Sequence, residues 1–147
     1  MSAAFIEFKV NSHGRFQRLR DVFVALQQSK TSEEWQNEEY WLAYFNDEER
    51  ATFWWPSERE LMEWEQRWFS TPLPDRWSDP TLKKPWIFRS MIDAFKNSEC
   101  ELKDCRVVTG DIARLEFVPY SHPYGGTGCM EALIHAFGFS ILRTDAP

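Results

Sequence analysis

The sequence lacks the features that mark membrane-spanning and secreted proteins. No uninterrupted apolar run reaches the length of about 18 residues that a membrane helix needs. The segment from Met1 to Lys9 has neither a basic start nor a long apolar core, so it does not have the pattern of a signal peptide. We therefore expect a cytoplasmic protein that has no membrane partner.

Basic residues are also in deficit. The chain has 17 Lys and Arg against 23 Asp and Glu, which gives a formal net charge of −6. Nucleic-acid binding depends on basic side chains that displace counterions from phosphates, so nucleic acid is not an expected partner. The same balance disfavours an anionic membrane surface, whereas it allows attraction to a basic protein.

Cysteine is scarce and odd in number, with Cys100, Cys105 and Cys129 only. Without a secretion signal, reduced thiols are expected. An offset of five residues on a strand places Cys100 and Cys105 on opposite faces, and the spacing of Cys129 and His135 does not match a zinc site. We therefore predict no metal and no cofactor.

The length of 147 residues and the 43% hydrophobic content indicate one globular domain, residues 1–147. Period-two and helical patterns predict a strand over 5–10, a helix over 15–28, a hairpin of 102–108 and 112–118, a helix over 128–137 ended by Gly138, and a strand over 139–142. These elements predict an α+β fold, with a mostly antiparallel sheet built from hairpins and helices packed on one face.

Two capping boxes and two aromatic runs organise the middle of the chain. Thr31–Glu34 predicts a short helix that carries Trp35. The aromatic runs 40–45 and 51–55 favour a β-hairpin, because aromatic residues suit a half-buried pleated surface. One continuous helix over 32–53 is the alternative, since Glu and Ala favour helices.

The second capping box, Ser57–Glu60, predicts a helix that runs to about Phe69. Three prolines between positions 71 and 84 predict an ordered surface loop. Pro85 suits the first position of a further helix, whose apolar stripe consists of Phe88, Met91, Ile92 and Phe95.

All eight tryptophans lie between Trp35 and Trp86, and from position 31 to position 70 eleven Asp and Glu stand against three Arg. Most of these rings are expected in the core, above all Trp64 and Trp68 on their helix stripe. Adjacent residues of a strand face opposite ways, so either Trp54 or Trp55 is expected at the surface.

Exposed aromatics with an acidic rim are typical of a surface that binds a basic protein. We therefore predict a small acidic binding or regulatory protein, for example an inhibitor or immunity-type protein that holds a basic toxic enzyme inactive. The sequence leaves the oligomeric state open. The predicted contact residues are Trp41, Tyr44, Asp47, Glu48, Glu49, Trp54 and Trp55.

The segment from Tyr120 to Cys129 is the alternative site. Adjacent glycines before a helix N-terminus allow backbone amides to hold a small anion. A nucleophilic Cys129 with His122 is conceivable, but no acid is placed to orient the histidine, so no catalytic residue is assigned and an enzyme is disfavoured. The predicted ligand-binding residues are Tyr120, His122, Tyr124, Gly125, Gly126, Thr127 and Cys129.

Overall fold

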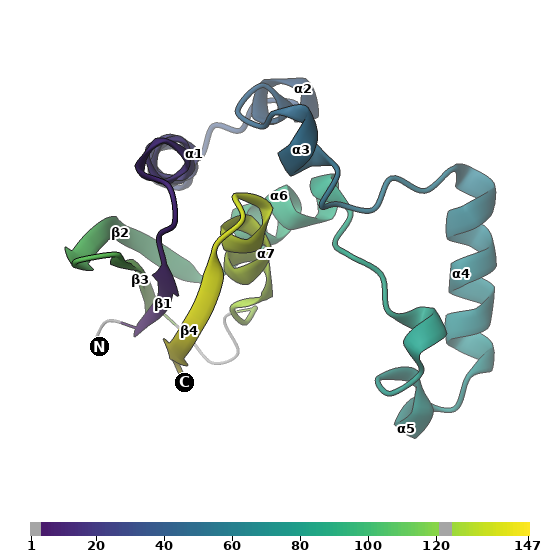
Figure 1. The fold of residues 1–147 in the computed structure, drawn as a ribbon. Helices are drawn as coiled ribbons and strands as arrows, with labels where there is room; N and C mark the ends of the chain where they lie inside the picture. The colour runs from purple at the N-terminus through teal and green to yellow at the C-terminus, as the bar shows by residue number, and fades with distance from the viewer. Residues whose placement is uncertain (1–3, 121–124) are drawn as a thin grey trace.

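The computed structural model describes residues 4–120 and 125–147, and its architecture is α+β, as predicted (Figure 1). The predicted residues His122 and Tyr124 lie outside the described ranges. The elements follow in the order β1 (Ala4–Lys9), α1 (His13–Ser32), α2 (Glu38–Leu42), α3 (Asp47–Arg50), α4 (Glu58–Ser70), α5 (Leu73–Arg76), η1 (Pro80–Leu82), α6 (Phe88–Asn97), β2 (Cys100–Thr109), β3 (Ile112–Pro119), α7 (Gly128–Ala136) and β4 (Ser140–Asp145).

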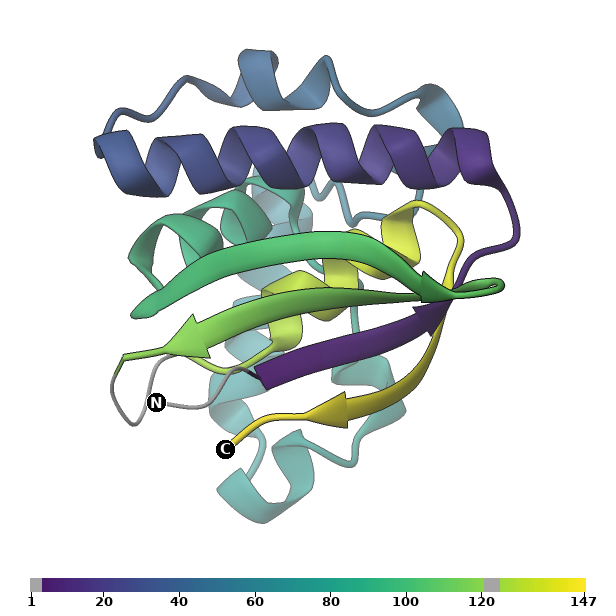
Figure 2. The same cartoon turned by 90° about the vertical axis from the view of Figure 1, so that its left-hand side faces the viewer.

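The four strands form one antiparallel sheet in the order β2-β3-β1-β4. β1 lies in the interior of the sheet, where Ile6 stands opposite Leu115 of β3. Figure 2 shows one face of this sheet turned to the viewer, with α6 and α7 behind it and α1 running alongside β2. The prediction that helices pack on one face of an antiparallel sheet is therefore confirmed.

Alternation along the strands decides which face is buried. Ile6 and Phe8 are fully buried on the helical side, and Leu115 and Phe117 of β3 lie beside them. Each such side chain contributes about 1.5–3 kcal/mol of transfer free energy. The helices cover this face with apolar side chains that include Leu19, Val22, Phe23, Leu26, Met91, Phe95, Leu133 and Ile134.

Polar side chains of α1 cover the outer edge of β2. Arg20 donates from Nε to the carbonyl of Cys105 at 3.1 Å. Gln27 donates from Nε2 to the carbonyls of Leu102 at 2.9 Å and of Lys103 at 3.0 Å. Because an open strand edge invites pairing with another chain, these bonds protect one edge of the sheet.

The helix predicted from the Thr31–Glu34 pattern is wrong, because α1 continues through these positions to Ser32. The Thr31 hydroxyl donates to the carbonyl of Gln27 within the helix and does not cap a new one. Lys30 donates to the carbonyls of Phe95 and Ser98, which holds the last turn of α1 against the end of α6.

The hairpin predicted for 40–45 and 51–55 is also wrong, and so is the continuous helix over 32–53. Two short helices, α2 and α3, occupy the region instead. Asn37 caps α2 by accepting a hydrogen bond from the Tyr40 amide, and Asn46 forms a capping box with Glu49. Asparagine three residues before Glu49 is a cap signal that the aromatic runs obscured.

The helix α4 confirms the Ser57–Glu60 capping box. Two short turns, α5 and η1, lie within the predicted proline loop. Pro85 does not begin the next helix, because α6 starts at Phe88. The Trp54 amide donates to the carbonyl of Trp86 at 2.9 Å, which keeps the chain extended just before α6.

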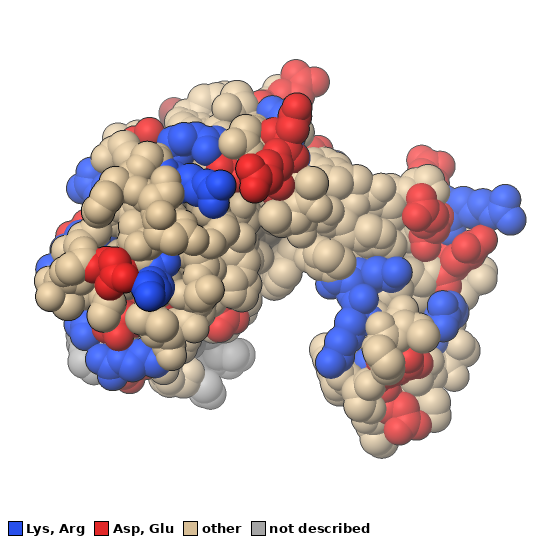
Figure 3. All heavy atoms as spheres, viewed as in Figure 1, with Lys and Arg blue, Asp and Glu red and all other residues tan. Residues whose placement is uncertain are grey.

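Residues 56–86, which we call the arm, stand away from the rest of the molecule, which we call the body (Figure 1). The arm holds α4, α5 and η1. All of it is described, and Leu82 is its only buried residue. In the space-filling view a hollow separates the lower part of the arm from the body, and Lys and Arg side chains gather on the side of the arm that faces it (Figure 3).

Candidate functional site

A groove on the arm brings together most of the tryptophans. α4 supplies its inner wall with Leu61, Trp64 and Trp68, and the returning chain supplies the opposite wall. The cavity has a volume of ≈ 630 Å³. Its lining residues are Trp54, Leu61, Trp64, Glu65, Trp68, Arg76, Trp77, Leu82, Lys83, Lys84, Pro85, Trp86, Ile87 and Ser90.

Four indole rings follow one another along this groove. The ring centroids of Trp54 and Trp64 are 6.0 Å apart, those of Trp64 and Trp68 are 5.3 Å apart, and those of Trp68 and Trp77 are 5.0 Å apart. Trp64 also donates from Nε1 to the carbonyl of Leu82 at 2.9 Å, which ties α4 to η1. Ring pairs of this kind add about 0.5–1.5 kcal/mol each to the burial of their area, so the arm has a defined shape.

These tryptophans do not form the core that their helix stripe predicted. Trp64 and Trp68 are half-buried, and no residue of α4 is fully buried. Trp77 is the most open of the rings, with 73% of its surface exposed. α4 does have an apolar stripe, but only the short segment that follows the helix covers it. The apolar face therefore stays partly in contact with water.

Cations border the groove. The guanidinium of Arg76 lies 5.6 Å from the ring centroid of Trp68, and the ammonium of Lys84 lies 5.6 Å from that of Trp54. Lys83 adds a third positive charge, whereas Glu65 is the only carboxylate in the lining. The groove is therefore locally basic on a protein that is acidic overall.

The contact residues predicted around the two aromatic runs do not form one surface, because some of them are buried and the others are exposed. Trp41 is fully buried. Glu49 is buried too, and its carboxylate accepts hydrogen bonds from both terminal nitrogens of the Arg18 guanidinium. Neither side chain is therefore available at the surface: Trp41 packs against Trp35 and Tyr44, and Glu49 holds α3 against α1 through Arg18.

The other residues of that predicted surface are accessible but scattered. Asp47 and Glu48 are exposed on α3, and Trp54 belongs to the groove of the arm. Trp55 is 47% exposed and stacks on Phe88. The half-buried Tyr44 accepts or donates a 3.2 Å hydrogen bond with the Tyr40 hydroxyl, which together with burial raises the pKa of Tyr44 to about 12.

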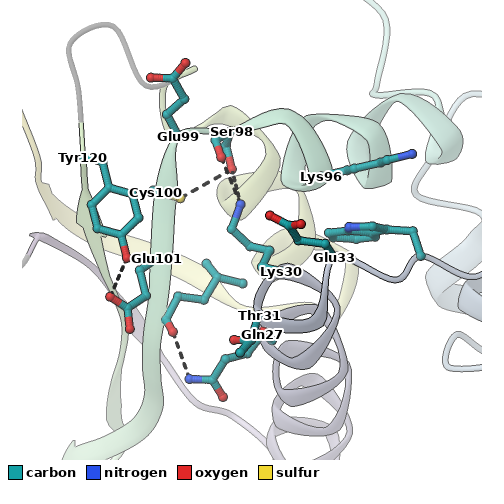
Figure 4. Close-up of a pocket in the computed structure, with 12 residues that line it drawn as sticks. Gln27, Lys30, Thr31, Glu33, Lys96, Ser98, Glu99, Cys100, Glu101 and Tyr120 are labelled. Atoms are coloured by element: carbon teal, nitrogen blue, oxygen red, sulfur yellow. Dashed lines mark hydrogen bonds between the residues drawn. The ribbon is translucent and has the colours of Figure 1, made fainter.

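The predicted ligand residue Tyr120 lies at a second pocket, between the end of α1, the end of α6 and strand β2 (Figure 4). This pocket has a volume of ≈ 590 Å³. The Tyr120 hydroxyl donates to the Glu101 carboxylate at 2.7 Å, and this bond raises the pKa of Tyr120 and lowers that of Glu101.

The central cation of this second pocket is already engaged within the protein. Lys30 reaches across from α1 and donates to the carbonyl of Phe95 at 2.8 Å, to the carbonyl of Ser98 at 3.0 Å and to the Ser98 hydroxyl at 3.0 Å (Figure 4). An ammonium group has three N–H donors, so all three are used for structure. The pocket is polar, but its best-placed donors join α1 to α6.

The Gly-Gly turn has the backbone that the sequence predicted, without the predicted helix cap. Gly125 and Gly126 have φ values of 103° and 79°, which only glycine adopts easily. Thr127 makes no capping hydrogen bond. Gly128 lies against the Trp86 ring, where an added Cβ would stand 2.9 Å from a ring carbon.

Cys129 does not have the environment of a nucleophile. Its thiol is buried, and desolvation raises its pKa to about 12 in spite of the backbone N–H groups at the start of α7. Burial outweighs those amides, so the thiol stays protonated at neutral pH. Among the residues that the structure describes, no three His, Cys, Asp or Glu side chains are grouped to hold a metal ion.

The sequence contained a signal for the groove that the core interpretation missed. The stripe of Trp64 and Trp68 is followed by a proline-rich segment whose few apolar residues, among them Trp77 and Leu82, are too widely spaced to cover it fully. Arg76, Lys83 and Lys84 lie in that same segment. An apolar helix face that the neighbouring sequence covers only in part indicates a partly exposed aromatic surface.

Comparison with known proteins assigns no family to this chain. No protein-family model matches it, and neither does any curated protein or solved structure. In the described ranges, 4–120 and 125–147, no helix has the length and apolar content needed to cross a membrane.

Proposed function

We propose that this protein is a protein-binding module and that the groove of the arm is its main contact surface. The observation that carries the proposal is the row of tryptophan rings on the arm, with Trp64 and Trp68 half-buried and Trp77 exposed, where Leu82 is the single buried residue. Monomeric proteins rarely expose large contiguous apolar patches unless another molecule covers them. Interfaces are enriched in Trp and Arg, which are the residue types of this groove.

The charges of the groove favour a partner segment that is apolar and acidic. Arg76 and Lys84 already lie over indole rings, and such cations pair readily with carboxylates at the rim of an interface. The sequence predicted a basic partner, and that prediction now applies to a separate surface on the body, formed by Trp55, Asp47 and Glu48. That surface has one exposed ring, whereas the groove has several rings in contact.

Capture from a lysate of the native cell tests the proposal with two matched variants. Trp77→Ala removes the most exposed ring of the arm, and Trp55→Ala removes an exposed ring of the body. We expect Trp77→Ala to lose at least tenfold of a captured protein that wild type retains, because interface tryptophans are frequent hot spots. Trp55→Ala is expected to retain it.

The reverse pattern would assign binding to the surface predicted from the sequence. A bound protein that is basic, that is released by salt and that depends on Trp55 would contradict the groove. Retention by both variants would contradict both surfaces. Circular dichroism of each variant shows whether a loss of binding reflects a loss of fold.

A small-molecule function has one observation in its favour, the pocket of Figure 4 with Tyr120 and Glu101 at its wall. Binding to the native state must raise thermal stability. We expect phosphate and nucleotides at about millimolar concentration to leave the melting temperature unchanged, because Lys30 is already bonded. If a ligand raises the melting temperature of wild type but not that of Tyr120→Phe, the functional site is this pocket and not the groove.

A further inference from the structure

The wall of the groove opposite α4 is an extended segment of the chain, residues 83–87. The backbone torsions φ and ψ are −77° and 117° at Lys83 and −74° and 133° at Ile87. These values are near those of polyproline II, about −75° and +145°. Pro85 lies between the two residues, and its ring holds its own φ at about −65°. The groove therefore already packs one polyproline-like segment of its own chain beside tryptophan rings.

A hydrogen bond at the start of this wall shows how an indole can hold such a segment. Trp64 donates from Nε1 to the carbonyl of Leu82 at 2.9 Å. Among the residues that the structure describes, the other four indoles of the lining donate to no acceptor. They are the rings of Trp54, Trp68, Trp77 and Trp86. An indole N–H is a donor only, so these rings keep donors that the carbonyls of an occupant can use.

The balance of donors and acceptors in the groove limits what can fill it. Arg76, Lys83 and Lys84 can only donate, like the indoles, whereas Glu65 and Ser90 are the side chains of the lining that can accept. An occupant must therefore bring many acceptors and few donors. A proline-rich backbone has this balance, because each proline keeps its C=O and lacks an N–H. In polyproline II these carbonyls have no internal hydrogen bonds, whereas the carbonyls of a helix are already used.

Two lysines give the groove its open positive charge. Lys83 and Lys84 are exposed, and neither has an ion-pair partner within residues 4–120 and 125–147. Lys84 shares a smaller hollow with Glu60 and Glu63. The Glu60 carboxylate accepts a hydrogen bond within the capping box of α4, and Glu63 pairs with Arg59 at 3.1 Å. These acids of α4 are therefore engaged elsewhere.

The acids of the return chain do not compensate the two lysines either. Asp75 and Asp79 lie outside the lining of the groove. The Asp79 carboxylate accepts hydrogen bonds from the amide and the hydroxyl of Thr81, at 2.9 Å and 2.7 Å. Carboxylates on the occupant would complement the charge that remains at Lys83 and Lys84.

From this geometry we infer that the groove binds an acidic, proline-rich segment of another protein, in the polyproline II conformation, beside residues 83–87. This inference rests on the proposed function and names the chemistry of its partner. The prolines of the segment lie against the indole rings, and its carbonyls accept hydrogen bonds from the free indole N–H groups. Its carboxylates pair with Lys83 and Lys84. Docking of proline-rich segments in aromatic grooves is a general mode of peptide recognition.

Isothermal titration calorimetry of the full chain with a synthetic peptide tests the inference. The probe consists of Pro and Glu only and has about ten residues, so it spans roughly 31 Å as polyproline II. We expect a dissociation constant of about 10 to about 100 µM. A peptide with Ala in place of every Pro keeps the charge. It is expected to bind about tenfold more weakly, because it is less preorganised and adds N–H donors.

Reversal of the two lysine charges tests the acidic part of the motif. Lys83→Glu combined with Lys84→Glu is expected to weaken the binding of the Pro and Glu peptide about 30-fold and to remove most of its salt dependence. Lys9→Glu combined with Lys103→Glu is the matched control, because it changes the net charge equally on the body, where these side chains are 60% and 50% exposed. The control is expected to bind within about twofold of wild type.

Loss of one indole N–H tests the hydrogen bonds. Trp77→Phe keeps an aromatic ring at a position that is 73% exposed and removes only the donor and part of the ring area. It is expected to weaken binding about threefold to tenfold, the effect of one hydrogen bond. Trp55→Phe removes an indole N–H of the body and is expected to bind as wild type does. Circular dichroism of every variant verifies the fold.

Several results would overturn the inference: no saturable binding up to about 1 mM peptide, equal affinity for the Ala peptide, tighter binding of a peptide with Lys in place of Glu, or full affinity in the Lys83→Glu and Lys84→Glu double variant. If capture from the lysate still depends on Trp77, the protein-binding function stands and the partner has a different chemistry. If capture fails as well, both are refuted.

Discussion

The body and the arm use aromatic residues in opposite ways. In the body, Phe8, Phe88, Phe95 and Phe117 are fully buried between the sheet and its helices. In the arm, the tryptophan rings pack against one another, and Leu82 alone is buried. A sheet offers a wide surface against which several helices pack, whereas a single helix and its return segment cover each other on one side only. The difference separates residues that hold the fold from residues available for contact.

The sharpest test of this contrast is one substitution made in both regions. Phe88→Ala removes a fully buried ring that lies 5.0 Å from the Phe45 centroid and 5.2 Å from the Phe53 centroid. It is expected to lower the free energy of unfolding by about 3–5 kcal/mol, because a cavity remains. Urea unfolding followed by circular dichroism measures the change.

The same substitution in the arm, Phe69→Ala, is expected to change the free energy of unfolding of the monomer by about 0.5 kcal/mol or less. The comparison is made at protein concentrations below any self-association, so that only folding is measured. Equal effects at Phe88 and Phe69 would mean that the arm is part of the same core.

The second test concerns the ion pair that joins the α2–α3 region to α1. Glu49 is buried and pairs with Arg18, whose side chain is 38% exposed. Glu49→Ala is expected to cost about 2–3 kcal/mol, below the full cost of breaking a buried pair because Arg18 can still reach water. Glu48→Ala is the control, since Glu48 is exposed and 3.8 Å from Arg15, and exposed pairs contribute about 0–1 kcal/mol.

A third prediction separates the arm from the body in stability. Ser57→Ala removes the hydrogen bond from the Glu60 amide to the Ser57 hydroxyl and is expected to cost about 1 kcal/mol. Hydrogen exchange is expected to quicken in α4 while the protection of β3 stays unchanged, because local openings need not involve the whole molecule. Ser57→Asp keeps a cap and serves as the control. Faster exchange in both regions would contradict an arm that opens by itself.

The smallest expected effect is a change in acid sensitivity on the body. Arg114 and Arg143 hold the pKa of Glu7 below its usual value of 4.5. A carboxyl whose pKa is lower in the folded state stabilises the fold above its unfolded pKa, and that contribution disappears as the pH falls through the folded pKa. Glu7→Gln is therefore expected to lose less stability than wild type between about pH 7 and about pH 3.

Thermal unfolding across this pH range measures the difference. An unchanged loss of stability in Glu7→Gln would show that this carboxylate does not contribute to acid sensitivity.

The predicted residues divide according to how local their signals are. The strand around Ile6, the hairpin around Gly110 and the Ser57 cap were predictable, because their patterns depend on neighbouring residues alone. The helices α2 and α3 were missed although Asn37 and Asn46 are good caps, because the aromatic runs favoured strands. α1 was predicted too short, because distant acceptors on α6 hold Lys30 in place.

The candidate site was predictable in composition but not in position. The concentration of tryptophan and the amphipathic pattern of α4 were visible in the sequence, and they indicated rings that pack together. The sequence did not distinguish Trp41, which is buried among α2 and its neighbours, from Trp77, which is exposed on the arm. Both residues have the same intrinsic hydrophobicity, and only their surroundings differ.

The sequence by itself determined the α+β class, the alternation that makes one face of the sheet apolar and the amphipathic character of the main helices. These properties depend on side-chain chemistry repeated at the period of a strand or a helix. The tertiary structure alone decided that α4 leaves the body, that Glu49 is buried and that burial raises the pKa of the Cys129 thiol further. Burial depends on which distant segments meet, and no local pattern specifies the number of neighbours that cover a given side chain.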